Sequence, residues 1–222
     1  MGPVIQTHNG FVNQFYGDGI MALFLGNSGD ALQAGREMMR TLKHYNAERA
    51  DKQREPLRIG IGLHTGSMMM GMIGDEQRLD TGLVSDTVNT AARLEGITKR
   101  YAADILFSEA VYSGLQESER QDIRLLGRVQ VVGKQATLNI YECFSENPAA
   151  LYDLKAQSTV LLHGAFEAYF RQDFKTAREG FAEVLRIFPD DPVASRQLEL
   201  SQYWAQHPLP EGWNGSETMQ KK

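Results

Sequence analysis

The sequence has little of what marks secreted or membrane proteins. Its 222 residues include a single cysteine, Cys143, which excludes an intrachain disulfide and favours a reducing compartment. No run approaches the roughly 18–20 apolar residues that span a bilayer, and no basic and apolar leader opens the chain. The 23 basic residues are outnumbered by 28 acidic ones, so no positive surplus attracts a nucleic acid or an anionic membrane. These absences predict a cytoplasmic protein with no nucleic-acid polymer as partner and no membrane span.

The composition is that of a folded chain, and its patterns divide it into two regions. With 42% hydrophobic and 23% charged residues, collagen-like and wholly disordered classes are excluded. Strand and helix patterns alternate as far as residue 148, after which only helical patterns follow. We therefore expect a domain over residues 1–148 and an α-helical tail over residues 149–222. Ala177, Phe181 and Pro189 have tetratricopeptide-like (TPR-like) spacing, but stable arrays need about three repeats, so the tail is expected to pack on the domain or on a partner.

The domain opens with a hairpin pattern. Two β-compatible stretches within residues 10–24 flank Gly17-Asp18-Gly19, and this turn chemistry predicts that Asp18 lies at the tip. Asp30 is expected to cap a helix over about residues 31–50. The next predicted strand, residues 57–63, has glycines on one face, which usually means that something large packs against its backbone.

The rest of the domain continues the alternation. A strand is predicted over residues 68–73 and a helix over residues 86–101. Two further strands, residues 126–132 and 137–144, are joined at Gly133-Lys134. Alternating strands and helices are typical of the α/β or α+β class.

A few side chains are candidates for chemistry. Asn89 and Arg93 are four residues apart on the predicted helix and share a face, and an amide beside a guanidinium suits a phosphate or sugar oxygen. Taken singly, each candidate has a simpler interpretation: an exposed helix face for these two, and a turn residue for both Asp18 and Lys134. A lone histidine such as His64 is more often structural than a metal ligand.

Taken in order, however, three segments point to one family. GFVNQFYGDGIMALF, RIGIGLHTGSMMMGMIGDEQRLD and LVSDTVNTAARLEGITK together resemble the class III nucleotide cyclase domain of adenylate and guanylate cyclases. The resemblance runs from about residue 2 to residue 143, and the helical tail is similar to those that follow this domain in many bacterial adenylate cyclases. It implies an α+β, ferredoxin-like fold.

The resemblance also implies a reaction and a set of roles. The ribose 3′-oxygen of a nucleoside triphosphate attacks the α-phosphorus and releases pyrophosphate, with two divalent ions, Mg²⁺ or Mn²⁺, held by two aspartates. Asp18 matches the second metal aspartate, Asn89 the ribose-orienting asparagine, and Arg93 the arginine that stabilises the transferring phosphate. Lys134 lies where the family has a triphosphate-binding lysine, although Val132 replaces a second lysine common there. In the family these groups come from two chains, which implies a homodimer with composite sites.

Base selection is less conventional. The positions that read the purine in the family are occupied here by Gln14 and Gly82. An amide both donates and accepts hydrogen bonds, so Gln14 fits either purine edge, and Gly82 offers only backbone. Gln14 is not the acid that a guanine edge prefers. ATP is therefore expected ahead of GTP, with reduced discrimination.

The family's first strand, with its Phe-x-Asp-Ile-x-Gly-Phe motif and first metal aspartate, has no counterpart in residues 1–222. Because that strand is central in the family's sheet, its neighbours are expected to lose a ladder partner, and little cyclase activity is expected from residues 1–222 alone. Three interpretations follow: the C-terminal part of a genuine cyclase, a catalytically degenerate homologue acting as a dimerisation or regulatory partner, or a protein-interaction module built on the tail.

Overall fold

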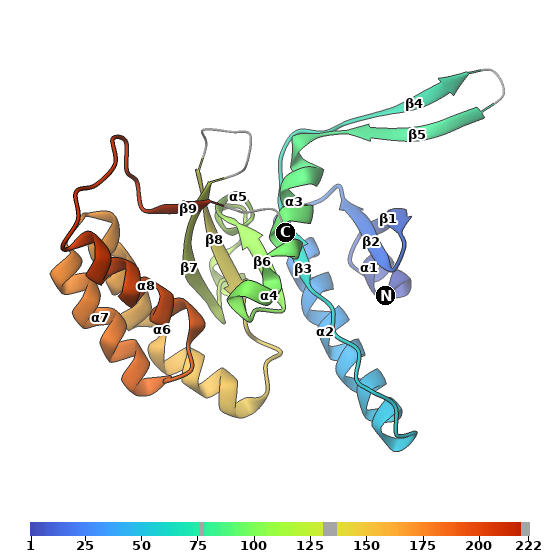
Figure 1. The fold of residues 1–222 in the computed structure, drawn as a ribbon. Helices are drawn as coiled ribbons and strands as arrows, with labels where there is room; N and C mark the ends of the chain where they lie inside the picture. The colour runs from blue at the N-terminus through green and yellow to red at the C-terminus, as the bar shows by residue number, and fades with distance from the viewer. Residues whose placement is uncertain (76–77, 131–136, 219–222) are drawn as a thin grey trace.

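The computed structural model describes residues 1–75, 78–130 and 137–218, and the strands in this part of the chain form three separate sheets (Figure 1). One is a hairpin near the N-terminus, one is a five-stranded sheet at the centre, and one is a projecting two-stranded arm. The helices of the tail lie against the far side of the central sheet from the hairpin.

A short helix and the hairpin open the chain. Helix α1 (Gly2–Thr7) precedes strands β1 (Gly10–Tyr16) and β2 (Gly19–Phe24), which pair antiparallel. Gly17, at φ +62°, and Asp18 form the turn, so the predicted hairpin is confirmed. The hairpin contacts α1 and the following helix α2 (Ser28–Asp51) and belongs to no larger sheet among the described residues.

Helix α2 is longer than expected and is capped by a different residue. The N-cap is Asn27, whose side-chain oxygen accepts a hydrogen bond from the backbone nitrogen of Asp30 at 2.9 Å. The expectation that Asp30 caps this helix was wrong, because Asp30 already lies in the first turn, where its charge suits the positive end of the helix dipole. The first half of the helix packs on the central sheet, where Leu32 shares a buried cluster with Ile105 and Phe107, and its second half extends beyond the sheet (Figure 1).

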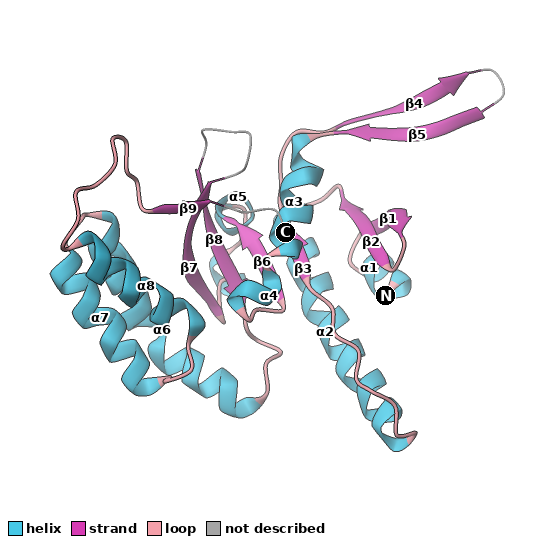
Figure 2. Ribbon diagram, in the orientation of Figure 1, coloured by secondary structure: helices cyan, strands magenta, loops and turns pink. Residues whose placement is uncertain are grey.

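The central sheet has the order β3–β6–β8–β7–β9 (Figure 2). Its strands are β3 (Ile61–Leu63), β6 (Ile105–Ser108), β7 (Ile123–Gln130), β8 (Thr137–Cys143) and β9 (Ser216–Thr218). β3 is parallel to β6 and β9 is parallel to β7, whereas β8 is antiparallel to both of its neighbours. This mixed sheet confirms the α+β class. In the described chain no strand pairs with the outer edge of β3, and β9 was not predicted.

The projecting arm and the helices beside it complete the domain. Strands β4 (Met69–Asp75) and β5 (Arg78–Val84) form the arm, of which only the first strand was expected. Helix α3 (Asp86–Gly96) is followed directly by the short helix α4 (Thr98–Tyr101), so the helix predicted over residues 86–101 is interrupted at Ile97. A short helix α5 (Glu109–Ser113) and a 3-10 turn (Glu117–Glu119) connect β6 to β7.

The tail shares a core with the central sheet. It consists of α6 (Ala149–Phe170), α7 (Phe174–Ile187) and α8 (Pro192–Trp204). Fully buried Phe166 and Phe181 of the tail belong to the same apolar cluster as Leu126 and Ile140 of the sheet. Of the two expected placements, on the preceding domain or on a partner, the structure shows the tail packed on the central sheet.

A buried ionic network reinforces this contact. Glu142 on β8 bonds Arg124 on β7 and accepts a hydrogen bond from the Lys155 ammonium at 2.7 Å. Arg124 also donates to Asp191, the N-cap of α8, at 2.6 Å. Burial alone would lower the pKa of Arg124, but the two carboxylates raise it above its ordinary value, so the guanidinium stays charged.

No helix in the described part of the chain is long and apolar enough to cross a membrane.

Candidate active site

Gly62 of β3 and Gly60, which directly precedes the strand, determine where α3 and α4 lie. A Cβ on Gly62 would collide with the backbone oxygen of Ala91 and the backbone nitrogen of Glu95, both in α3. A Cβ on Gly60 would likewise meet the side-chain oxygen of Thr98. Because side chains are absent there, the helix backbone rests directly on the strand. The prediction that something large packs on this glycine face is confirmed.

The start of α3 is tied to the loop before the arm. Ser85 caps the helix, and its Oγ accepts a hydrogen bond from the backbone nitrogen of Thr87 at 3.0 Å. The hydroxyls of Ser85 and Thr87 both donate to the carbonyl oxygen of Ser67, at 3.0 and 3.2 Å. Gly66 leaves room for this contact, since a Cβ there would lie 2.7 Å from Thr87 Oγ1. The helix is thus fixed at its N-terminus as well as along its length.

Asn89 and Arg93 are brought together by α3. They lie one turn apart on the same helix, with Asn89 exposed and Arg93 partly buried. Both side chains are therefore at least partly exposed, on a helix whose backbone is held by Gly62 along its length and by the Ser67 carbonyl at its N-terminus. An amide and a guanidinium on one rigid face can donate hydrogen bonds to neighbouring oxygens of one ligand.

Asp18 and Gln14 lie on the separate hairpin. Asp18 is exposed at the turn between β1 and β2. Gln14 is exposed on β1, next to an irregularity in the register, and its side-chain oxygen accepts a hydrogen bond from the Tyr16 hydroxyl at 3.0 Å. The hairpin packs on α1 and α2, whereas α3 packs on β3 and β6. Within one chain these two candidates therefore lie on a different element from Asn89 and Arg93, and α2 lies between that hairpin and the central sheet.

Two further candidates are less informative. Gly82 lies on β5, where its backbone is in register with Gly71 of β4, so it belongs to the arm and not to the hairpin of Gln14. Lys134 lies outside the described residues. His64, not assigned a ligand role, bonds the Ser108 hydroxyl through Nδ1 at 2.7 Å, which fits a structural histidine.

Family membership follows from the sequence that builds this site. Residues 17–144 match the model of the adenylate and guanylate cyclase catalytic domain. The chain belongs to this family. The match to the cyclase domain includes Asp18, the arm, α3 and the β7–β8 hairpin, and it ends just before the tail.

Known cyclases of both base specificities resemble the chain. The adenylate cyclase of Anabaena cylindrica is 38% identical over 148 residues, which cover 64% of this chain and 30% of that protein. The crystal structure of the guanylyl cyclase Cya2 has a TM-score of 0.53 at 28% identity, covering 63% of this chain and 72% of that one. A bacterial light-regulated adenylyl cyclase gives a TM-score of 0.55 at 27% identity, covering 71% and 47%. The cyclase fold is therefore confirmed, and the chain spans less than a third of the Anabaena protein.

The described residues do not by themselves build a two-metal site. Asp18 offers a single exposed carboxylate. Among the residues that the structure describes, no group of three His, Cys, Asp or Glu side chains is arranged to hold a metal ion. Two-metal cyclase chemistry needs a second carboxylate close to the first.

The sequence missed one element of this region, strand β5. A signal was present, because Leu79, Thr81 and Leu83 alternate with Asp80 and Gly82, the period of a strand. Gly74 and Asp75, at the end of β4, are residue types that also favour a hairpin connection.

Proposed function

We propose that this chain contributes the catalytic domain of an enzyme that converts ATP to 3′,5′-cyclic AMP and pyrophosphate. The observation that supports the proposal best is the placement of Asn89 and Arg93, one turn apart on a helix whose backbone rests on Gly62 of β3. Such a rigid pair suits a reaction in which two oxygens of one ligand must be held in a fixed relation.

The chemistry requires little covalent participation from the protein. The ribose 3′-oxygen forms a bond to the α-phosphorus while the bond from that phosphorus to the pyrophosphate oxygen breaks, and the hydroxyl proton is released to water. Arg93 stabilises charge on the phosphate oxygens, and Asn89 orients the ribose by hydrogen bonding. Divalent Mg²⁺ or Mn²⁺, when bound, neutralises phosphate charge in such reactions. Asp18 is the residue proposed to bind it, as an exposed carboxylate at the hairpin turn.

We further propose that the site is shared between two copies of the chain. Asp18 and Gln14 lie on the hairpin, apart from the α3 residues, so one protomer presents the hairpin to the α3 face of its partner. Each homodimer then has two composite sites. A monomer is inactive because it cannot bring the two sets of residues to one substrate.

ATP is the proposed substrate ahead of GTP. Gln14 lacks the negative charge that suits the donor edge of guanine, and its amide can both donate to and accept from adenine. Its hydrogen bond from Tyr16 orients the side chain but leaves the amide nitrogen as a donor. A relative at 38% identity is named adenylate cyclase, while a structural neighbour at 28% identity is named guanylyl cyclase.

The test is product formation from ATP and GTP by residues 1–222 and by a form extended upstream in the same reading frame. Arg93→Ala and Asn89→Ala are expected to lower kcat by about 10²–10³-fold, because each removes an interaction with the reacting groups. Arg178→Ala, an exposed arginine on α7, is the matched control and should leave activity unchanged. A preference for GTP would contradict the substrate assignment, and full activity of Arg93→Ala would contradict the site.

Complementation tests the shared site. Asp18→Ala and Arg93→Ala proteins are each expected to be inactive. An equal mixture should recover about a quarter of the wild-type rate, since half of the dimers are then mixed and each has one intact site. No recovery in a mixture that is shown to exchange subunits would place both residues in sites within one chain.

A second function is favoured by one observation: of the family's two metal aspartates, only the second has a counterpart in residues 1–222, namely Asp18. A degenerate homologue would bind nucleotide and dimerise without turnover. In that case the extended protein would retain ATP binding, measured by calorimetry, and form no cyclic product from either nucleotide.

A further inference from the structure

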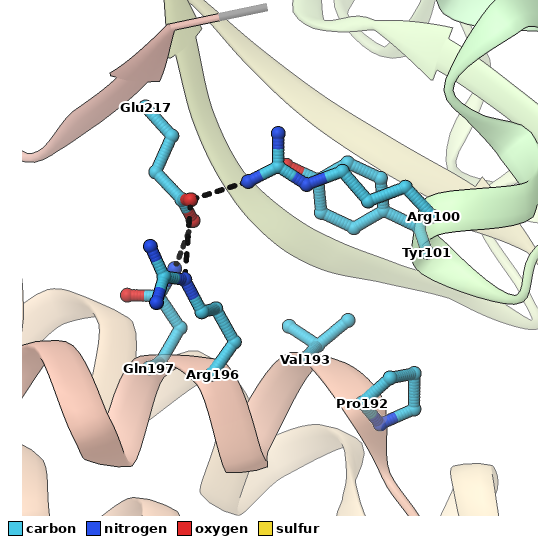
Figure 3. A pocket seen from close by; sticks show the side chains of 7 residues that line it. All are labelled: Arg100, Tyr101, Pro192, Val193, Arg196, Gln197 and Glu217. Carbon is cyan, nitrogen blue, oxygen red and sulfur yellow. Dashed lines mark hydrogen bonds and ion pairs between the residues drawn. The ribbon is translucent and has the colours of Figure 1, made fainter. Parts of the chain in front are cut away.

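Near the end of the described chain, Glu217 on β9 is held by three side chains from two other elements. One carboxylate oxygen lies 2.5 Å from Arg100 Nη2 and 3.5 Å from Arg196 Nε. The other accepts a hydrogen bond from Gln197 Nε2 at 3.1 Å. Figure 3 shows the carboxylate pointing between the two guanidinium groups. The tail's last strand is therefore fastened by charge as well as by backbone pairing.

The two arginines connect different parts of the molecule. Arg196 and Gln197 belong to α8 of the tail, but Arg100 belongs to α4, which follows α3 with only Ile97 between them. Thr98, also in α4, packs on Gly60 beside Glu95 of α3. Arg100 therefore links Glu217 to the helical segment that directly follows the C-terminal end of α3.

The backbone around Glu217 is fitted to this position. β9 pairs with β7 from Arg128 to Gln130. The Arg128 guanidinium donates to the carbonyl oxygen of Asn214 at 2.7 Å and lies 4.2 Å from the centre of the Phe170 ring. Gly215, at φ +77°, approaches Phe170 so closely that a Cβ would lie 2.7 Å from a ring carbon. The backbone of Asn214 and Gly215, which leads into β9, is thus held by contacts with Arg128 and Phe170.

The Glu217 carboxylate is also better shielded than its partners. Its side chain is 14% exposed, against 43% for Arg100 and 51% for Arg196. A single exposed ion pair contributes little, but one shielded carboxylate shared by two guanidiniums and an amide forms a network. Besides burial, its charge raises the pKa of the neighbouring Tyr101 to about 12, so the effect of Glu217 extends into α4.

We propose that Glu217 is a positioning residue of the cyclase: by holding Arg100 it fixes the α3–α4 unit and so the placement of Asn89 and Arg93. The inference rests on the proposed function, because it assigns Glu217 an effect on the same reaction. It makes the tail a part of the catalytic apparatus. Release of β9 loosens the α3–α4 unit without removing any group that contacts the substrate.

The first experiment is steady-state kinetics of Glu217→Gln, in the form of the protein that is active. Since α3 residues act on the transition state, kcat is expected to fall about three- to tenfold while KM changes less than about twofold. Glu217→Asp, which keeps the charge, should recover at least half of the lost rate. Glu211→Gln, an exposed glutamate in the same tail, is the control and should behave as wild type. An unchanged kcat in Glu217→Gln, or no recovery with Asp, overturns the proposal.

The second experiment needs no activity and separates this proposal from the proposed function. Amide hydrogen exchange of residues 86–101 is compared between wild type and Glu217→Gln. Exchange in α4 and the last turn of α3 is expected to become at least about fivefold faster, while the β1–β2 hairpin is unaffected. Unchanged exchange in α3–α4 overturns the positioning role even if the cyclase is active. Faster exchange in a protein without cyclase activity supports the coupling and contradicts only the proposed function.

Gly215→Ala gives an independent way to release β9 with Glu217 intact. The added methyl group meets the Phe170 ring and a positive φ, so the strand should detach. Both tryptophans, Trp204 and Trp213, lie in the tail, and Trp213 packs on Tyr169 and Phe174, so tryptophan fluorescence reports the release. The same kcat loss as in Glu217→Gln is expected. A released strand with an unchanged kcat overturns the proposal.

Discussion

The two ends of the molecule are built in opposite ways. The tail is joined to β7 and β8 through a shared apolar core, a buried ionic network and an added strand. The β1–β2 hairpin is a two-stranded sheet with Phe15 and Tyr16 66% and 57% exposed. Two-stranded hairpins alone are marginally stable in water.

This difference in packing matters for the candidate site, because its residues lie both on a firmly held helix and on the two-stranded hairpin. Asn89 and Arg93 lie on a helix fixed by glycines and capped by Ser85, whereas Asp18 and Gln14 lie on the hairpin. One half of the site is therefore preorganised within the chain. The other half depends on what the hairpin packs against.

The largest expected effect is in the ionic network. Glu142→Gln removes the charge between Arg124 and Lys155, whose side chains are 1% and 3% exposed. Breaking a buried network by neutralising one member leaves uncompensated charge, so the free energy of unfolding should fall by about 3–5 kcal/mol. Urea unfolding followed by tryptophan fluorescence measures the loss.

Glu183→Gln is the matched control, because its partner Arg186 lies on the exposed face of α7. Its effect should stay within about 0.5 kcal/mol. A loss below about 1 kcal/mol for Glu142→Gln would show that water reaches the network and that the tail is held less firmly than the contacts indicate.

The next effect concerns the contact between β3 and α3. Gly62→Ala places a methyl group against the backbone of α3 and should cost about 1–3 kcal/mol, with α3 displaced. Gly71→Ala on β4 is the control, since a Cβ there has no neighbour within 4 Å. Thermal unfolding of the two variants compares them directly. Equal stability would mean that α3 shifts at no cost, contrary to a preorganised pair of Asn89 and Arg93.

Local chemistry explains which parts of this structure the sequence predicts. The hairpin follows from Gly17-Asp18-Gly19, and the close approach of α3 follows from Gly60 and Gly62, directly before β3 and within it. The helix cap was assigned to Asp30 and not to Asn27 because both residue types favour that position, and only the backbone geometry distinguishes them.

Contacts between distant residues explain what could not be predicted. Arg124 pairs with a residue 18 positions away and with another 67 positions away, and nothing near it in the sequence indicates either partner. β9 is three residues long, too short for a period-two pattern to be recognised. The positioning of Arg100 by Glu217 spans 117 residues and depends on the complete tail being in place.

The smallest expected effect tests the weakly attached end. Phe15→Thr on β1 replaces a side chain that is 66% exposed with a good strand former, so the free energy of unfolding should change by less than about 0.5 kcal/mol. Circular dichroism in urea, at two protein concentrations tenfold apart, measures it. A loss above about 1 kcal/mol only at the higher concentration would show that the hairpin buries Phe15 against a second copy. The hairpin would then be weakly packed only in the monomer, and dimerisation would complete its packing and its part of the site.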